Sequence, residues 1–476
     1  MAQKSQNTVE NNVKALFVMP LVYTVYPLQI AALSAYLKKN GHEVKYMEFL
    51  MGQHFDKVRQ DQLSELLRTF DPDLVGFSSY EMSYEWIKEM STFIKMQSDV
   101  PIIVGGYFAT LSPDIVIEHP AVDIVCVGEG EKALSELLER MKTGKDISDI
   151  KSLYVKKNGT IFRNKIGNLT ENLDELPFVD RTLISYQEHI DKHLGLISIM
   201  ASKGCSYNCS YCSNFFLKDI YENSRKYVRF RSPGNIIAEI EECEKHYKFE
   251  RIVFEDDMFA LNLKWLRNFA GEYKKRFSYP FRCQLRPEVS KKETLTLLKD
   301  MGCELVSIGL EAGDERIRRE VLRRNMSDKK IIDAAKNIKE VGIRLRTYNM
   351  VGIPEETIGT ILKTIFLNLR IAPHEVQTTI YYPFKGTSLG DKCYKEGWID
   401  YEKKKRLKLY ANDSLLNHQT IPRPIIIMAK WINSATAFRS GKITFIKSGL
   451  QVLSGKLKSM FPYRLFHNFE WGKSHS

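Results

Sequence analysis

Residues 197–212 read ISIMASKGCSYNCSYC, which joins a strand pattern to a compact run of cysteines. The apolar residues of Ile197–Ala201 are typical of a short buried strand. Directly after this strand come Cys205, Cys209 and Cys212 in a C-x₃-C-x₂-C arrangement. Cysteine thiolates bind zinc or iron–sulfur clusters well, because both are soft acceptors. The stretch therefore predicts a metal-binding loop at the carboxyl end of a strand.

The number of cysteines in this loop favours a cluster of four irons. No fourth cysteine or histidine lies nearby in the sequence, so the trio does not complete a tetrahedral zinc site. In a four-iron cubane, three ligands leave one iron open to a small molecule. The alternatives are an incomplete zinc site and three unrelated thiols. The remaining cysteines form no motif, and we expect them to be buried core thiols: Cys126, Cys243, Cys283, Cys303 and Cys393.

The cysteine loop opens a series of alternating strand and helix patterns. Ser232 and Pro233 have the residue types of a helix N-cap and first turn. Six β/α units predict a partial, open relative of the eight-stranded (β/α) barrel, in which chemistry gathers at the carboxyl ends of the strands. The strand candidates are Ile197–Ala201, Arg251–Phe254, Phe281–Leu285, Leu305–Leu310, Arg344–Val351 and Val376–Tyr382.

A separate alternating series precedes the loop, over residues 13–145. Strand candidates are separated by helical patterns and turn signals, which predicts a doubly wound parallel sheet of the flavodoxin-like type. Ligands of such sheets bind at the carboxyl ends of the strands. Those ends carry Ser78-Ser79, Gly105-Gly106 and Gly128-Glu129-Gly130. The strand candidates are Ala15–Met19, Val44–Phe49, Leu74–Ser78, Ile102–Val104 and Asp123–Val127.

The chain is thus expected to hold two α/β domains and a basic extension. Its length of 476 residues and its 43% apolar content suit a globular protein with more than one core. Leu153–Phe162, with Asn158-Gly159 at its centre, predicts a hairpin. The expected division is a disordered N-terminus at 1–12, the sheet domain at 13–145, a hairpin and linker at 146–194, the half-barrel at 195–400 and the extension at 401–476.

The charge and hydropathy of the chain predict its cellular location and what its basic extension contacts. No run of 18 uninterrupted apolar residues occurs, and the polar start of the chain lacks the apolar segment of a secretory signal. We therefore expect a cytoplasmic protein. Residues 401–476 hold 14 Lys and Arg against 3 Asp and Glu, which is nearly all of the net charge of +12. An apolar stripe in this extension predicts packing on the barrel or docking on the inner membrane surface, with nucleic acid less favoured. The stripe is Ile446, Leu450, Leu453, Leu457 and Met460.

The cysteine run, with Tyr211 before its last cysteine, resembles the signature of the radical S-adenosylmethionine (SAM) superfamily. Further marks follow successive strand candidates: Phe254-Glu255-Asp256-Asp257, Gln284-Leu285-Arg286, Gly309-Leu310-Glu311-Ala312-Gly313 and Val351-Gly352-Ile353-Pro354-Glu355-Glu356-Thr357. The last resembles G-x-P-G-E-T, except that Glu355 replaces a glycine. The resemblance implies a [4Fe–4S] cluster on Cys205, Cys209 and Cys212. It also implies SAM contacts by Tyr211, Glu255, Asp256, Arg286, Glu311 and Gly352.

The same resemblance implies the chemistry. The open iron would chelate the amine and carboxylate of SAM, and one electron would cleave SAM to methionine and a 5′-deoxyadenosyl radical. That radical removes hydrogen from an unactivated carbon. The electron comes from an external donor such as flavodoxin or ferredoxin. Because the cofactors supply the reactivity, no side-chain nucleophile is expected.

The N-terminal series resembles the cobalamin-binding domain that is fused to many radical SAM enzymes. The resemblance rests on the glycine- and serine-rich strand ends, and it implies cobalamin contacts by Ser78, Ser79, Gly105, Gly106, Gly128, Glu129 and Gly130. The D-x-H-x-x-G motif that supplies an axial histidine is absent, and Phe108 stands where many relatives have histidine. Gly128-x-Gly130-x-x-Ala133 is not a dinucleotide fingerprint, because it follows the fifth strand and carries Glu129 and Glu131. A domain that kept the fold but lost the corrin is the alternative.

Together these resemblances predict a cobalamin-dependent radical SAM enzyme that methylates an unactivated carbon of a small-molecule or lipid substrate. A radical cyclisation, rearrangement or oxidation with the same cofactors is the first alternative. A non-catalytic sensor of cobalamin or redox state is the second. A methylthiotransferase would need a second trio of cysteines, and residues 1–125 contain no cysteine.

Overall fold

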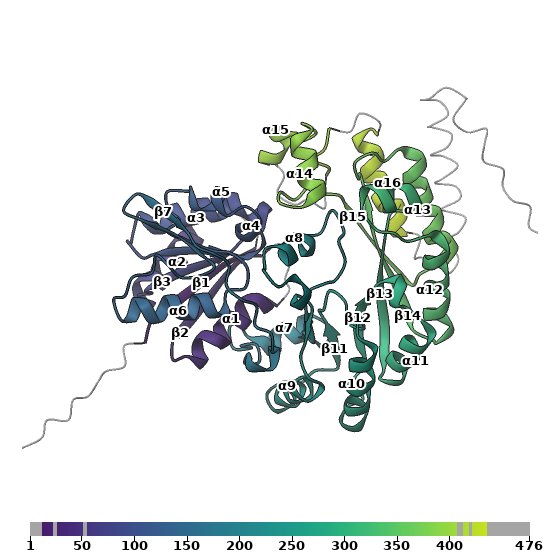
Figure 1. Cartoon of the computed structure of the whole chain (residues 1–476), viewed down its shortest axis with the longest axis horizontal. Coiled ribbons are helices and arrows are strands. Elements are labelled where there is room, and N and C mark those ends of the chain that lie inside the picture. Colours follow the sequence, from purple (N-terminus) through teal and green to yellow (C-terminus); the bar gives the residue numbers. More distant parts are fainter. Residues whose placement is uncertain (1–11, 22–25, 51–54, 407–412, 418–420, 436–476) are drawn as a thin grey trace, which may run out of the picture.

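The computed structural model of the chain describes residues 12–21, 26–50, 55–406, 413–417 and 421–435, which form two sheet-based domains side by side (Figure 1). The N-terminal sheet has seven strands in the order β2-β1-β3-β4-β5-β6-β7. Its first five strands are parallel, and their order is the flavodoxin-like 2-1-3-4-5. Their bounds are β1 Lys14–Leu21, β2 Glu43–Leu50, β3 Leu74–Ser78, β4 Ile102–Gly105 and β5 Ile124–Cys126.

Alternating side chains of these strands are buried on both faces of the sheet, because helices cover each face. One face packs against α1 (Leu28–Lys39) and α6 (Glu131–Lys142). The other face packs against α2 (Lys57–Phe70), α3 (Tyr84–Lys95) and the short helices α4 (Gly106–Leu111) and α5 (Pro113–Ile117). The predicted doubly wound sheet is therefore confirmed.

The predicted hairpin forms, and it joins this sheet. Strand β6 (Leu153–Lys157) pairs antiparallel with β5, and β7 (Thr160–Arg163) pairs antiparallel with β6. The hairpin thereby extends the sheet at its edge, a placement that the sequence pattern did not indicate. The connector that follows contains α7 (Tyr186–Lys192).

The second sheet is six-stranded and wholly parallel, in the order β15-β14-β13-β12-β11-β8. The strands are β8 Leu196–Ile199, β11 Arg251–Phe254, β12 Phe281–Leu285, β13 Cys303–Glu311, β14 Arg344–Val351 and β15 Glu375–Ile380. Helices α9 Pro233–His246, α10 Leu263–Arg276, α11 Lys292–Asp300, α12 Asp328–Glu340 and α13 Ile358–Ile371 cover its outer face (Figure 1). This is the open half-barrel that the sequence predicted, and Ser232 caps α9 through its side chain.

Smaller elements complete the half-barrel domain. Strands β9 (Ser202–Lys203) and β10 (Arg229–Phe230) pair with each other, and α8 (Ser213–Asp219) follows the cysteine loop. Three C-terminal helices come last: α14 (Ser388–Lys395), α15 (Tyr401–Arg406) and α16 (Arg423–Ala435). Helix α16 packs on the edge of the half-barrel, where Asn433 Nδ2 donates to Thr378 Oγ1 (2.9 Å).

The domains are joined by buried polar contacts. Glu81 of the N-terminal domain accepts from the Lys385 N–H (2.7 Å) and the Tyr394 hydroxyl (2.7 Å), and it contacts the Lys404 ammonium (2.5 Å). In the connector, Asp180 binds Lys38 of α1 (2.7 Å), and Arg181 binds Glu239 of α9 (2.9 Å). The connector is therefore tied to both domains.

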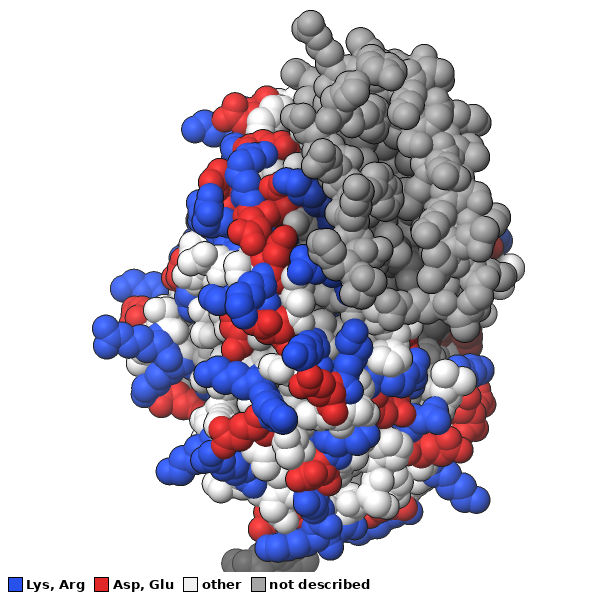
Figure 2. All heavy atoms as spheres, turned by 90° about the vertical axis from the view of Figure 1, so that its right-hand side faces the viewer, with Lys and Arg blue, Asp and Glu red and all other residues white. Residues whose placement is uncertain are grey.

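The outer face of the half-barrel mixes basic and acidic side chains (Figure 2). Many are neighbours on one helix, such as Lys329 with Asp333 and Lys336 with Glu340 on α12. No described helix is long and apolar enough to cross a membrane. The apolar stripe predicted at 446–460 and the N-terminal segment 1–11 lie outside the described residues.

Candidate functional site

The cysteine loop lies between β9 and α8, at the carboxyl end of the half-barrel. Cys209 is buried, and Cys205 and Cys212 are partly exposed. Gly204 has a φ of +89°, and a Cβ there would collide with the Tyr227 carbonyl, so the loop begins at a position that needs glycine. Cys212 is the N-cap of α8, and its sulfur accepts a weak hydrogen bond from Asn214 Nδ2 (3.8 Å).

Ser210 anchors the loop to two distant segments. Its hydroxyl donates to the Val321 carbonyl (2.6 Å), and its N–H donates to the Leu322 carbonyl (3.1 Å). Its own carbonyl accepts from the Leu389 N–H of α14 (2.8 Å). These bonds hold the cysteine sulfurs in place before any metal binds, which is the preorganisation that a cluster site needs.

Two buried arginines meet at the sulfur of Cys209. The Arg286 Nη1 lies 3.2 Å from this sulfur, and the Arg324 Nη1 lies 4.0 Å from it. Arg286 also pairs with Glu288 (2.8 Å) and stacks on the Tyr207 ring at 3.7 Å. Both guanidinium groups therefore lie within contact distance of a predicted cluster ligand.

Arg324 was missed by the sequence analysis. It donates to the Tyr211 hydroxyl (3.2 Å) and the Gly309 carbonyl (2.6 Å), and it lies 3.6 Å from Glu311. It therefore joins two of the predicted SAM residues, Tyr211 and Glu311, to the cysteine loop. Its only sequence signal is a basic pair, Arg323-Arg324, downstream of the G-x-E-x-G stretch.

The donor set fits an iron–sulfur cluster. Burial raises the pKa of the Cys205 thiol, and it raises the pKa of the Cys212 thiol to about 12. These thiols thus stay protonated at neutral pH until a metal displaces their protons. Within the described residues, no three His, Cys, Asp or Glu side chains converge as one ion would require. Thiolates that each bind a different iron of a cubane need not converge.

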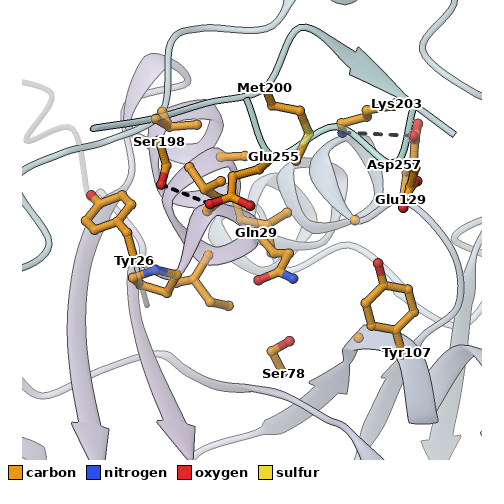
Figure 3. A pocket seen from close by; sticks show the side chains of 18 of the residues that line it. Tyr26, Gln29, Ser78, Tyr107, Glu129, Ser198, Met200, Lys203, Glu255 and Asp257 are labelled. Carbon is orange, nitrogen blue, oxygen red and sulfur yellow. Dashed lines mark hydrogen bonds and ion pairs between the residues drawn. The ribbon is translucent and has the colours of Figure 1, made fainter. Parts of the chain in front are cut away.

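Three acidic residues directly follow β11 and face different ways. Asp256 is 1% exposed and accepts from the Ala201 N–H (3.1 Å) and from the Ser202 hydroxyl. Asp256, which was predicted to contact SAM, therefore points into the protein interior and does not line the cavity. Glu255 and Asp257 lie on the opposite side of the chain, as alternation requires, and line the cavity between the domains (Figure 3).

Asp257 lies on the cluster side of this cavity. After burial itself, the Asp257 charge is among the causes that raise the pKa values of the Cys205 and Cys212 thiols. The pKa of Asp257 is in turn raised by burial, against a hydrogen bond from Asn214. Asp257 belongs to the acidic motif after β11, but the family resemblance did not predict it as a SAM contact.

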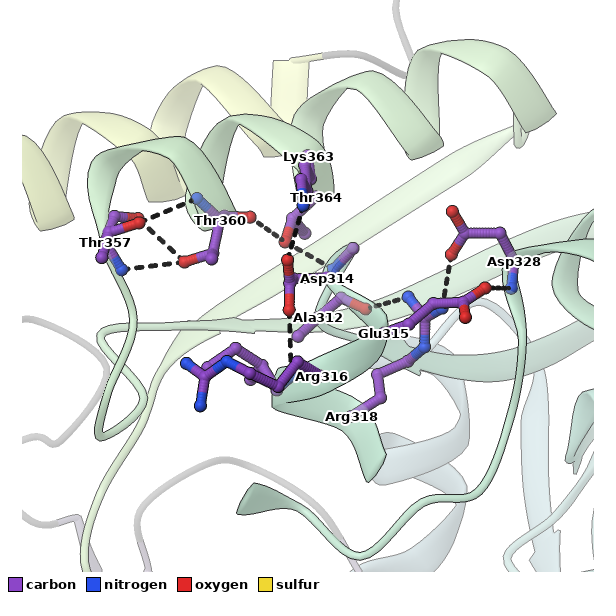
Figure 4. Close-up of polar contacts among 12 residues, drawn as sticks. Ala312, Asp314, Glu315, Arg316, Arg318, Asp328, Thr357, Thr360, Lys363 and Thr364 are labelled. Atoms are coloured by element: carbon purple, nitrogen blue, oxygen red, sulfur yellow. Dashed lines mark hydrogen bonds and ion pairs between the residues drawn. The ribbon is translucent and has the colours of Figure 1, made fainter. Parts of the chain in front are cut away.

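The G-x-E-x-G stretch ends β13 with a bulge, and Glu311 has a φ of +68°. A Cβ on Gly309 would overlap the Glu311 carboxylate. The following turn is locked to α13, since the Gly313 N–H donates to Thr364 Oγ1 (2.7 Å) and Lys363 pairs with Asp314 (2.7 Å) (Figure 4). Glu311 is thereby held next to Arg324.

The buried Arg318 supports this turn from below. Its Nη1 donates to the Ala312 carbonyl (2.7 Å), its Nε donates to the Met326 carbonyl (3.0 Å), and it pairs with Asp328 of α12 (Figure 4). The side chain is fully buried, so the guanidinium serves the scaffold and is not available to a ligand.

The turn after β14 has a left-handed backbone conformation at Glu355, the position where the family motif has a glycine. Gly352 has a φ of +76°, and Glu355, which replaces the expected glycine, has a φ of +65°. The Glu355 carboxylate pairs with Arg316 (3.0 Å) and Lys392 (3.0 Å). Glu356 turns inward and accepts from the Ile353 N–H (2.9 Å).

The carboxyl edge of the N-terminal sheet forms the opposite wall of the cavity. Ser78, Gly105, Gly106, Gly128 and Gly130 all line it, and together they make a wall of small residues. Such a wall fits a large flat ligand such as a corrin, because glycine and serine let the ligand approach the backbone closely.

Ser79 and Phe108 face the interior of the domain. The Ser79 hydroxyl donates to the Gly105 carbonyl (2.7 Å) and accepts from the Ala109 N–H (3.0 Å), so Ser79 supports the edge. Phe108 packs against Tyr84 in the core, with ring centroids 5.0 Å apart. Tyr107 faces the cavity in its place.

Glu129 lines the cavity, but its carboxylate is tied to the other domain. It binds Arg229 (2.6 Å) and lies 3.9 Å from Lys203, which also pairs with Glu131 (2.7 Å). These bonds lower the pKa of Glu129 against the effect of burial. The predicted cobalamin residue is therefore a domain-joining residue in this structure.

The cavity between the two edges has a volume of about 990 Å³. Its lining comes from both domains and the connector, with Ser78 and Tyr107 on one side and Ser198, Met200 and Glu255 on the other (Figure 3). A cavity of this size lies at the upper end of the range for small-molecule and cofactor sites.

A half-barrel whose strand ends carry a three-cysteine loop, beside a sheet edge of small residues, defines an enzyme class that cleaves SAM at an iron–sulfur cluster. The chain matches the family model of the Radical SAM superfamily over residues 199–367 and that of the B12 binding domain over residues 16–138. It belongs to the radical SAM superfamily and carries a B12-binding domain. It is a cobalamin-dependent radical SAM enzyme, and its cofactors are a [4Fe–4S] cluster, SAM and cobalamin.

Individual relatives agree with this assignment. An uncharacterized methyltransferase of Pyrococcus horikoshii is 26% identical over 76% of this chain and 77% of its own length. An anaerobic magnesium-protoporphyrin IX monomethyl ester cyclase of Rubrivivax gelatinosus is 22% identical over 79% of this chain and 68% of its own length. A hopanoid C-3 methylase of Methylococcus capsulatus is 25% identical over 71% and 64%.

A solved structure shares the whole arrangement. The radical SAM methyltransferase TsrM from Kitasatospora setae, with cobalamin and a [4Fe–4S] cluster bound, superposes with a TM-score of 0.64 at 18% identity. The match covers 81% of this chain and 78% of that protein. At this identity the likeness concerns the fold.

Proposed function

We propose that this enzyme is a C-methyltransferase that places a methyl group on an unactivated carbon of a small-molecule or lipid substrate. The observation that carries the proposal is the shared cavity, which has the cysteine loop's half-barrel on one side and the small-residue sheet edge on the other. The names of two relatives, a methyltransferase and a C-3 methylase, support methyl transfer.

Different residues would hold the cluster and the two ends of the SAM amino-acid group. Cys205, Cys209 and Cys212 would ligate the cluster. We assign the SAM amine to Asp257 instead of Asp256, because Asp257 lines the cavity near the thiols. Arg324 would bind the SAM carboxylate, since its guanidinium lies between the cysteine loop and Glu311.

Four further residues complete this arrangement. Arg286 would stabilise the Cys209 thiolate, and Tyr211, Glu311 and the Gly352 turn would contact the remainder of SAM. With these groups bound, the cofactors supply a 5′-deoxyadenosyl radical and a transferable methyl group. The chain positions the substrate and excludes water from the cavity. An external donor such as flavodoxin or ferredoxin supplies electrons.

The test begins with anaerobic purification in the presence of cobalamin, followed by quantification of iron, sulfide and corrin. Incubation with reductant, SAM and candidate substrates should yield 5′-deoxyadenosine and a product heavier by one methyl group, as measured by mass spectrometry. The variant Cys209→Ala should lose the cluster and SAM cleavage but keep the corrin, because the sheet edge belongs to the other domain. Loss of both cofactors together would contradict this assignment of sites.

A second candidate function is radical cyclisation without methyl transfer, favoured by the likeness to the magnesium-protoporphyrin cyclase. Its product would gain no methyl mass, so the same mass spectrum separates the two functions. A purely sensory protein would form no 5′-deoxyadenosine at all.

A further inference from the structure

The Lys and Arg side chains that line the cavity are already paired with acids. Charge pairing of this kind leaves little free positive charge for an anionic ligand. Within the described part of the chain the pairs are Lys203 with Glu131 (2.7 Å), Arg229 with Glu129 (2.6 Å), Arg231 with Glu239, Arg282 with Glu304 (2.5 Å) and Arg346 with Glu375.

One carboxylate remains on the half-barrel side without a basic partner. Glu255 extends into the cavity, and among the described residues its carboxylate accepts a hydrogen bond only from the Ser198 hydroxyl, at 3.4 Å (Figure 3). The residue is exposed to the cavity, and desolvation by the surrounding protein raises its pKa. Asp257 also lines the cavity, but it lies beside the cluster thiols and is the carboxylate that we assign to the SAM amine. Glu255, which the family resemblance placed among the SAM contacts, is then left for the substrate.

Two neutral polar side chains lie on the same wall. Gln284 and Ser307 are register neighbours on β12 and β13, and both line the cavity. Ser307 is only 4% exposed. In the described structure neither side chain makes a hydrogen bond to another residue. Both side chains therefore keep their hydrogen-bonding capacity for a ligand in the cavity.

We propose that the substrate carries an ammonium group on an apolar body, and that Glu255 binds this ammonium with Gln284 and Ser307 beside it. This inference rests on the proposed function and names its substrate class. The apolar body matches the rest of the wall, which includes Phe178 and Met200. An anionic group at this position would meet the Glu255 carboxylate and, among the described residues of the wall, no unpaired Lys or Arg.

The test uses the full-length holoenzyme with cluster, cobalamin and SAM, and three probes of equal chain length: n-octylammonium, 1-octanol and octanoate. Isothermal titration calorimetry at pH 7.5 should show n-octylammonium binding about tenfold more tightly than 1-octanol, and octanoate binding more weakly still. The net charge of +12 would favour octanoate non-specifically, so this order cannot arise from overall charge.

The variant Glu255→Gln should reduce n-octylammonium affinity about tenfold and leave 1-octanol unchanged. Glu250→Gln is the matched control, because Glu250 is exposed just before β11 and does not line the cavity. The proposal would be overturned if octanoate bound more tightly than n-octylammonium or if 1-octanol bound equally well. It would also be overturned if Glu255→Gln kept the wild-type preference for n-octylammonium. A holoenzyme that forms no 5′-deoxyadenosine would refute the proposed function, while the probe affinities would still test Glu255.

Discussion

Glu355 adopts a left-handed backbone conformation that usually requires glycine. Its left-handed φ of +65° costs a non-glycine residue about 1 kcal/mol. Its carboxylate contacts Arg316 and Lys392, which anchors the turn from outside. The departure from G-x-P-G-E-T therefore changes the side chain but leaves the turn intact.

The neighbouring Glu356 makes stability depend on pH. Burial raises its pKa to about 8 in the folded protein, well above its value in an unfolded chain. The folded state therefore holds a proton that the unfolded state has lost, and stability should fall between about pH 4.5 and pH 8, by up to about 1.4 kcal/mol per pH unit. Glu356→Gln should remove this fall, as measured by thermal unfolding midpoints from pH 5.5 to 8.5.

The control for this prediction is Glu340→Gln, at an exposed residue of α12 that pairs with Lys336. It should leave the pH dependence of the midpoint unchanged. A Glu356→Gln variant that follows the wild-type pH profile would show that Glu356 is ionised in the folded protein.

At the scale of elements, one close approach joins β13 to α13. A Cβ on Gly313 would clash with the backbone of Lys363 and Thr364, and backbone cannot move aside as a flexible side chain can. Gly313→Ala should therefore destabilise the half-barrel by about 2–3 kcal/mol and weaken SAM binding, because Glu311 lies on the same turn. Differential scanning calorimetry and SAM titration measure the two effects.

Gly359→Ala is the matched control, since its Cβ would meet only Thr357 Oγ1 at 3.6 Å inside the first turn of α13. Alanine there should be neutral or stabilise by about 0.5–1 kcal/mol. Equal effects of the two alanines would mean that Gly313 is not needed for the close approach.

For the whole molecule, Glu81 is the residue that holds the C-terminal helices against the B12-binding domain. Its buried carboxylate accepts hydrogen bonds from the Lys385 N–H and the Tyr394 hydroxyl and pairs with the Lys404 ammonium. Glu81→Ala should weaken this contact by about 1–3 kcal/mol, because the Lys385 N–H, the Tyr394 hydroxyl and the half-buried Lys404 ammonium lose their shared acceptor. Limited proteolysis should then cut between the domains faster, while the corrin content stays the same.

Asp333→Asn tests whether any lost ion pair has this effect. Asp333 forms an exposed pair with Lys329 on α12, and such pairs contribute less than about 1 kcal/mol. Proteolysis rates should not change in this variant. Equal rates in Glu81→Ala and the wild type would show that the domains are held together elsewhere.

Most elements of the fold could be predicted from the sequence, because period-two and period-3.6 patterns are local. The strands β3, β11, β12 and β14 have the predicted bounds. The short helices α4, α5 and α8 escaped prediction, since five to seven residues are too few to show a period. The attachment of the hairpin to β5 also escaped, because edge pairing is decided by residues distant in the chain.

The sequence by itself determined the cysteine loop, the two alternating series and their strand-end glycines, since these depend on residue type and spacing alone. Only the tertiary structure decided which side chains reach the cavity. It brought Arg324 to Cys209 across 115 residues, turned Asp256 inward and Asp257 outward, and paired Glu129 with Arg229 of the other domain. The direction of a side chain and the identity of its partner depend on contacts between distant segments. Local sequence patterns do not predict those contacts.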